Sequence, residues 1–197
     1  RVGSTGDITA AVKFNGSLGQ ANYGVFAASE DGDAARDFFA ARVTRDFDGH
    51  GLGAMATRVE RPFLDRDANV FEVDHQWRPS ERLSVHLSYG TSVNTSGDTY
   101  RLSSTNENLD PEKSVNFEIG AKLDSADKRF TTRLALFRST KLNERNRDAD
   151  DASLVLLSGK RHATGIEVDL AGRITPKWEM FASYTWIPDA KVDAAGT

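Results

Sequence analysis

The chain has 197 residues, carries a formal net charge of -4 at pH 7, and consists of 39% hydrophobic and 27% charged residues. This ordinary balance excludes a strongly basic nucleic-acid-binding protein and an acidic disordered chain, so no nucleic-acid partner is expected. The absence of cysteine excludes a disulfide framework, a thiolate metal site and a cysteine nucleophile.

Segments of period-two alternation, each bounded by turn residues, follow one another along the whole chain, and helical periodicity is absent. Such segments of about ten residues predict β-strands, and we count about ten of them. They are expected at 7–16, 22–29, 38–47, 52–63, 68–77, 82–90, 115–123, 129–145, 159–174 and 179–192.

The connections between these strands alternate between tight turns and longer polar loops. Tight turns are expected at 16–20, 48–51, 78–81, 124–128 and 175–178. In an up-and-down sheet all five lie at one end, which is the layout of outer-membrane barrels, with short periplasmic turns and long outer loops. The sequence therefore predicts an all-β protein over residues 1–197, an antiparallel up-and-down transmembrane β-barrel or a portion of a larger barrel.

Each predicted strand has an apolar face and a polar face. Aromatic residues beside the short turns (Trp77, Phe130, Trp178) and toward the loop ends (Tyr89, Trp186) suggest two girdles at the membrane interfaces. The alternating charges are expected to point into a polar lumen; they are Glu118, Lys122, Arg133, Glu167, Asp169 and Arg173. A soluble β-sandwich has the same one-dimensional pattern, and turn asymmetry and strand length favour the barrel.

No apolar stretch approaches the roughly 20 residues that a membrane helix requires. This does not exclude a membrane barrel, because strands that alternate lipid-facing and lumen-facing residues average to neutral hydropathy. The chain begins at Arg1 without a signal peptide, so we expect a mature chain or an excerpt of a longer one.

Signals for chemistry are weak. The four histidines, His50, His75, His86 and His162, do not have the spacing of a metal-binding motif. No G-x-S-x-G motif occurs, and the acidic stretch at 146–151 lacks the glycine and glutamate of a calcium loop. We therefore expect no metal site, no cofactor and no catalytic activity.

Two blocks of the sequence resemble the barrel of TonB-dependent outer-membrane receptors, particularly ferric siderophore receptors. The first block carries Asn108, Leu109, Pro111, Glu112, Ser114, Glu118, Gly120 and Lys122. The second carries Gly165, Glu167, Leu170, Gly172, Trp178 and 182–185. The resemblance covers about residues 77–197, whereas residues 1–75 resemble another outer-membrane barrel family more weakly, with the change near 76–90.

This resemblance implies a transporter for iron-siderophore complexes in the bacterial outer membrane, surrounded by outer-membrane lipid and energised by TonB. Family members have a plug, a TonB-contacting segment and a barrel of about 22 strands. We expect this chain to lack the plug and that segment, as an excerpt or a composite of barrel sequences. The alternatives are a porin-like or structural barrel without active transport, in which the strands close on themselves, and a soluble all-β binding module.

If the chain is a siderophore transporter, its arginines are the candidate ligand-binding groups, because guanidinium groups pair with anionic chelates. We expect Arg133, Arg138 and Arg161 to point inward. The competing expectation is that these arginines pair with lumen carboxylates, such as Glu118, Glu167 and Asp169. The candidates, loops included, are Arg101, Arg133, Arg138, Arg145 and Arg161.

Overall fold

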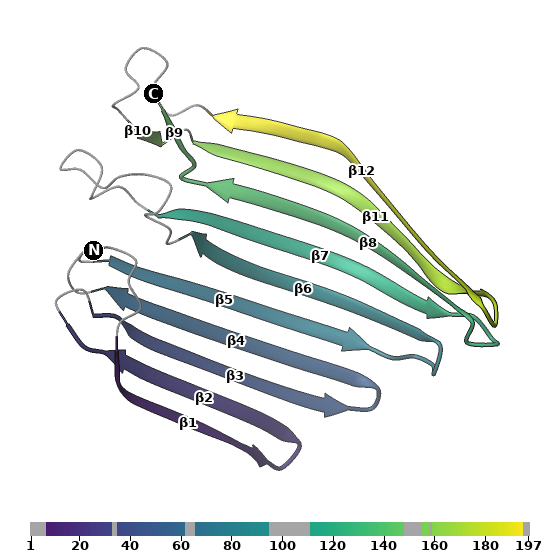
Figure 1. Ribbon diagram of the computed structural model, residues 1–197, viewed down its shortest axis with the longest axis horizontal. Coiled ribbons are helices and arrows are strands. Elements are labelled where there is room, and N and C mark those ends of the chain that lie inside the picture. Colours follow the sequence, from purple (N-terminus) through teal and green to yellow (C-terminus); the bar gives the residue numbers. More distant parts are fainter. Residues whose placement is uncertain are drawn as a thin grey trace.

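The computed structural model describes residues 7–32, 35–61, 66–94, 111–147, 155–157 and 159–194. Within these ranges the chain forms twelve strands, and ten of them build a single antiparallel sheet (Figure 1). Nothing in the described residues folds into a helix with the length and apolarity needed to cross a membrane.

The large sheet is a meander, in which each strand pairs with the next one along the chain. Its order is β1-β2-β3-β4-β5-β6-β7-β8-β11-β12. The bounds are β1 (Ile8–Leu18), β2 (Ala21–Glu30), β3 (Asp37–Phe47), β4 (His50–Arg61), β5 (Arg66–Trp77), β6 (Leu83–Asn94), β7 (Glu112–Asp124), β8 (Phe130–Leu142), β11 (Lys160–Thr175) and β12 (Trp178–Ala194).

A second, two-stranded ladder lies in the connection between β8 and β11. It pairs β9 (Arg145–Arg147) with β10 (Val155–Leu157). The sequence indicated only a long polar connection here, so this short ladder was not predicted. The apolar run Val155–Leu157 is too short for its alternation to distinguish a strand from a loop.

The five predicted tight turns are confirmed, and all lie at the same end of the sheet (Figure 1). The turn between β3 and β4 shows why the sequence dictates it. Asp48 and Gly49 both have positive φ, 46° and 78°, as a two-residue hairpin loop of the type I′ class requires. Aspartate tolerates this conformation and glycine adopts it without strain, so the Asp-Gly pair fixes the register of both strands.

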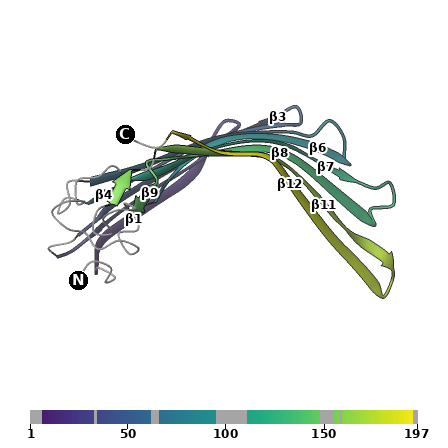
Figure 2. The ribbon, with the colours of Figure 1, turned by 90° about the horizontal axis from the view of Figure 1, so that it is seen from above.

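The sheet is strongly bent and remains open. Figure 2 shows it from above as an arch, with β1 and β12 belonging to different parts of the curve. Within the described part of the chain, β1 pairs only with β2, and β12 only with β11. The alternative in which these strands close on themselves as a small porin-like barrel is therefore wrong, and the sheet is a partial barrel, as the portion of a larger barrel that the sequence predicted.

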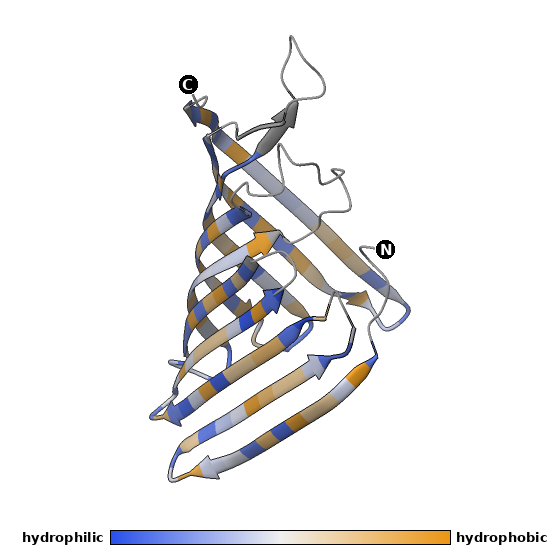
Figure 3. Ribbon diagram, turned by 90° about the vertical axis from the view of Figure 1, so that its left-hand side faces the viewer, coloured by the Kyte–Doolittle hydropathy of each residue, from blue (hydrophilic) through white to orange (hydrophobic). Residues whose placement is uncertain are grey.

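The sheet has no second layer and no dry core. Among the described residues, Ala68 is the only buried hydrophobic residue, and it is 9% exposed. Large apolar side chains remain open, including Phe117 at 45% and Tyr184 at 66% exposure. Figure 3 shows apolar and polar residues alternating along each strand. The soluble sandwich alternative required these residues to pack together, and the structure contradicts it.

Candidate ligand-facing surface

The cross-strand register assigns every strand residue to a face, because residues directly opposite each other point to the same side. Lys122, Arg133 and Asp169 lie opposite one another on β7, β8 and β11. The six charges that were expected to share a face do so, which confirms that prediction; they are Glu118, Lys122, Arg133, Glu167, Asp169 and Arg173. We call this side the polar face.

The opposite side, the apolar face, is formed by the other half of each strand. Its cross-strand rows include Leu87, Ile119, Leu136, Ile166 and Trp186. These side chains are open to the outside of a single-layered sheet, which is the arrangement of a barrel wall in lipid.

Two close contacts between polar side chains cross the middle of the polar face, and a glycine makes room for each. His86 Nε2 lies 2.7 Å from Glu118 Oε1, and a Cβ atom at Gly120 would lie 2.4 Å from His86 Cε1. Arg42 Nη2 donates to Asp74 Oδ2 at 2.8 Å, and the Asp74 carboxylate occupies the space beside Gly53. The glycines thus let charged side chains lie flat across neighbouring strands.

At the loop end of the polar face, two basic and two acidic residues form a connected group. Arg161 Nη2 lies 2.8 Å from Glu144 Oε1, and Lys141 Nζ lies 3.5 Å from both Glu144 and Glu112. Glu112 is only 7% exposed, which is unusual for a carboxylate on so open a sheet. Beside this group is a hollow of about 490 Å³, whose lining includes Ser114.

Another ion pair at the loop end lies toward the other edge of the sheet, between β2 and β3. Arg36 donates to both carboxylate oxygens of Glu30 at 2.6 Å, and the two residues close the connection between β2 and β3. The Glu30 carboxylate raises the pKa of the Arg36 guanidinium above its ordinary value, chiefly through this hydrogen bond. Arg36 also lies over the ring of Phe38.

The short-turn end of the polar face is held together across two turns. Arg129 donates to the backbone carbonyls of Arg173 and Ile174, so the turn after β7 is tied to the end of β11. Arg173 in turn lies 3.0 Å from Glu179 on β12. In the turn itself, the Ser125 hydroxyl holds the pKa of Asp127 below its ordinary value.

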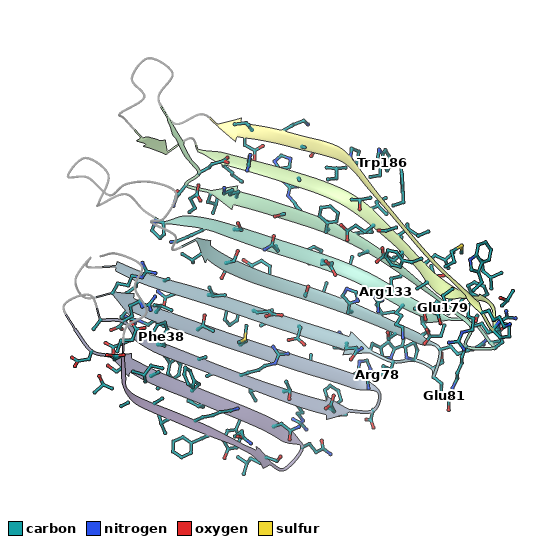
Figure 4. The ribbon with its side chains drawn as sticks, viewed as in Figure 1. Phe38, Arg78, Glu81, Arg133, Glu179 and Trp186 are labelled. Atoms are coloured by element: carbon teal, nitrogen blue, oxygen red, sulfur yellow. The ribbon has the colours of Figure 1, made fainter. Side chains whose placement is uncertain are left out.

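The five candidate arginines are placed very differently. Arg133 lies on the polar face (Figure 4) and, within the described residues, makes no ion pair. Arg161 is also on the polar face, and its partner is Glu144. Arg161 thus pairs with a carboxylate, as the competing expectation proposed, but the partner is Glu144 and not one of the three carboxylates given as examples.

The expectation that Arg138 points inward was wrong. It stands opposite Phe117 and Thr164, on the apolar face with Leu136. Arg145 lies in β9 opposite Leu157, and its side chain lies outside the described residues. Arg101 also lies outside them.

The structure brings together two histidines that the sequence kept apart. His50 Nδ1 lies 3.0 Å from His75 Nε2, and the rings are nearly parallel to each other and to Trp77. They form part of the aromatic rim at the short-turn end of the apolar face. In the described ranges, no three His, Asp or Glu side chains gather in a way that could hold a metal ion.

A bent antiparallel meander with short turns at one end, one open apolar face and one charged face defines the wall of a transmembrane barrel. The family described as "TonB dependent receptor-like, beta-barrel" matches residues 42–197, and the chain belongs to this family. It is thus part of a bacterial outer-membrane protein. The match starts within β3, so the resemblance reaches further toward the N-terminus than the expected boundary at residue 77.

Individual relatives agree with this assignment. The chain is 30% identical over 128 residues to the probable TonB-dependent siderophore receptor PiuA of Acinetobacter baumannii, covering 61% of this chain and 17% of PiuA. It is 32% identical over 148 residues to the probable TonB-dependent receptor BfrD of Bordetella pertussis, covering 73% of this chain and 20% of BfrD. The chain therefore spans about a fifth of the length of these relatives.

A solved structure shows the same fold. The ferripyoverdine receptor of the outer membrane of Pseudomonas aeruginosa, bound to ferripyoverdine, superposes with a TM-score of 0.61 and 17% sequence identity. The superposition covers 90% of this chain and 31% of that receptor. At this level of identity the likeness concerns the fold alone.

Proposed function

We propose that residues 1–197 form one portion of the barrel wall of an outer-membrane active transporter for iron-siderophore complexes. The observation that carries this proposal is the polar face, where charged side chains of neighbouring strands line one side of a bent sheet. The substrate class in this proposal is supported by the relatives, which are named as siderophore receptors. Transport occurs by passage along the polar face, without covalent chemistry and without a catalytic residue.

Arg133 and Arg161 are the described arginines that we propose to contact the ligand. Both lie on the polar face, and Arg161 borders the hollow at its loop end. Because Arg133 makes no ion pair within the described residues, its guanidinium is available for an anionic ferric chelate. Arg101 and Arg145 remain candidates, whereas the position of Arg138 on the apolar face removes it from this set.

We further propose TonB as the energy-supplying partner of the complete protein, and ferric siderophores as its ligands. The test is uptake of radiolabelled iron by cells that carry the intact protein as their only siderophore receptor. A panel of catecholate, hydroxamate and mixed chelates is supplied, in strains with and without TonB.

The proposal predicts uptake of at least one chelate, abolished without TonB and reduced severalfold by Arg133→Gln. Lys177→Gln, in the turn between β11 and β12, is the matched control and leaves uptake unchanged. Uptake that persists without TonB would instead indicate a porin-like barrel. The absence of uptake for every chelate would contradict the siderophore assignment.

A further inference from the structure

Arg138 lies on the apolar face, where no lumen water can solvate its charge. Its neighbours in register are Phe117 on β7 and Thr164 on β11, and Leu136 precedes it on the same face. Its guanidinium makes no hydrogen bond or ion pair with any residue that the structure describes. A charged side chain on a lipid-facing surface requires a counter-charge, and here the described protein supplies none.

The position of Arg138 along β8 sets the depth of this charge in the membrane. A transmembrane strand needs about 9–11 residues to span the bilayer, counted from the short-turn end. β8 begins at that end with Phe130, so Arg138 lies close to the outer limit of the span. Its long apolar stem therefore runs along the hydrocarbon edge, and its guanidinium reaches the headgroup level.

Two lysines lie on the same face, two same-face positions further toward the loop end. Lys113 on β7 and Lys160 on β11 both stand opposite Leu142 on β8. Neither lysine makes an ion pair within the described ranges. With Arg138 they form a group of three cations, which we call the outward cation group.

The nearby carboxylates on this face are already engaged. His162 contacts Asp189 and Asp193 at 2.8 Å each, and Lys191 lies 2.9 Å from Asp189. Within the part of the chain that the structure describes, these contacts leave no nearby carboxylate for the outward cation group, so its charge is complementary to an external anion.

Arg58 provides an internal comparison. It lies on the apolar face of β4, as far from His50 at the short-turn end of its strand as Arg138 lies from Phe130. Unlike Arg138, Arg58 is held by two carboxylates, Glu60 at 2.7 Å and Asp67 at 2.6 Å. Two outward arginines at corresponding positions thus differ in whether the protein neutralises them.

We propose that the outward cation group, Arg138 with Lys113 and Lys160, binds the phosphate of an anionic lipid headgroup in the outer leaflet. The planar guanidinium can donate two parallel hydrogen bonds to phosphate oxygens, and the lysines add charge. This site is separate from the transport function, because it lies on the opposite face of the sheet from Arg133 and Arg161.

The test measures binding of dihexanoyl phosphatidic acid to the intact protein in neutral detergent, by native mass spectrometry. Wild type is expected to bind this lipid more tightly than dihexanoyl phosphatidylcholine or inorganic phosphate. Arg138→Gln should weaken binding about fivefold, the effect of one cation near an anionic lipid surface. Arg58→Gln should leave it unchanged.

A protein that keeps its heat-modifiable gel mobility is accepted as folded. If Arg138→Gln does not fold, the double substitution Lys113→Gln/Lys160→Gln decides, with an expected loss of about twenty-five-fold. Unchanged affinity in the deciding variant would overturn the proposal. Equal affinity for phosphatidylcholine or for inorganic phosphate would also overturn it, because the site would then not recognise a lipid phosphate.

Discussion

His86 on β6 reaches across Gly120 on β7 to place its Nε2 atom 2.7 Å from Glu118 Oε1. The pair lies on the polar face, and both side chains are 42% exposed. The contact therefore depends on two features: the opposite signs of the pair when the histidine is protonated, and the missing side chain at residue 120.

The ion pair itself should contribute little to stability, because it is open to water. A double-mutant cycle with His86→Gln and Glu118→Gln is expected to give a coupling free energy below about 1 kcal/mol. The measurement is urea unfolding of the intact protein in detergent or lipid. A coupling of several kcal/mol would mean that this part of the face is dry.

The space at Gly120 should matter more than the ion pair. Gly120→Ala places a Cβ atom 2.4 Å from His86 Cε1 and 2.8 Å from the Leu134 carbonyl oxygen. This oxygen belongs to the backbone of the sheet and cannot easily move away. We expect a destabilisation of about 1–3 kcal/mol in the same unfolding experiment. Gly24→Ala is the matched control, since its nearest neighbour is 4.0 Å away. Equal effects at both positions would contradict the steric argument.

The Asp48-Gly49 turn gives a second backbone prediction. Gly49 has a φ of 78°, and an added Cβ would lie 3.0 Å from the Arg78 carbonyl oxygen. Gly49→Ala should therefore lower the free energy of unfolding by about 1–2 kcal/mol. Asp48→Gly, which allows the same positive φ, should be tolerated. A turn that accepted alanine at residue 49 without loss would have a different conformation from the one described.

Substitutions at adjacent residues of β8 compare the two faces of the sheet through their effects on the free energy of unfolding. Leu136 belongs to the apolar face and Ala135 to the polar face. Leu136→Arg should destabilise the protein in lipid by about 1–3 kcal/mol, because arginine on the lipid face costs about 2–4 kcal/mol at the bilayer midplane and about 0–1 kcal/mol near the interface, and Leu136 lies between the two. Ala135→Arg should have a much smaller effect, because that side chain meets water. Similar losses at both positions would argue against a lipid-facing side.

The strands, the turns and most of the face assignments could be predicted because they are local properties. The alternation in 115–123 predicts which side chains share a face, and the Asp48-Gly49 pair predicts where the chain reverses. The same rule, applied consistently, also places Arg138 with Leu136, since the two are separated by a single residue. We expected Arg138 to point inward because it is charged. The alternation of side chains along the strand, and not the charge of the residue, determines the face on which it lies.

Other features depend on register between strands and could not be read from one segment. His50 and His75 meet because β4 pairs with β5 in a register set by both flanking connections. Arg161 contacts Glu144 because the chain beyond β8 returns beside β11. Curvature and the open edges likewise depend on strand stagger across the whole sheet, which a sequence pattern of period two does not specify.

The most direct test of the central claim is a cysteine scan along β8 in lipid bilayers, since the chain contains no native cysteine. Residues 132 to 138 would each be replaced, spin-labelled, and probed for accessibility to oxygen, which enters lipid, and to a water-soluble nickel chelate. We predict period-two alternation, with oxygen access highest at residues 132, 134 and 136 and chelate access highest at 133 and 135. The absence of alternation, or the reverse phase, would contradict the assignment of the apolar face to lipid.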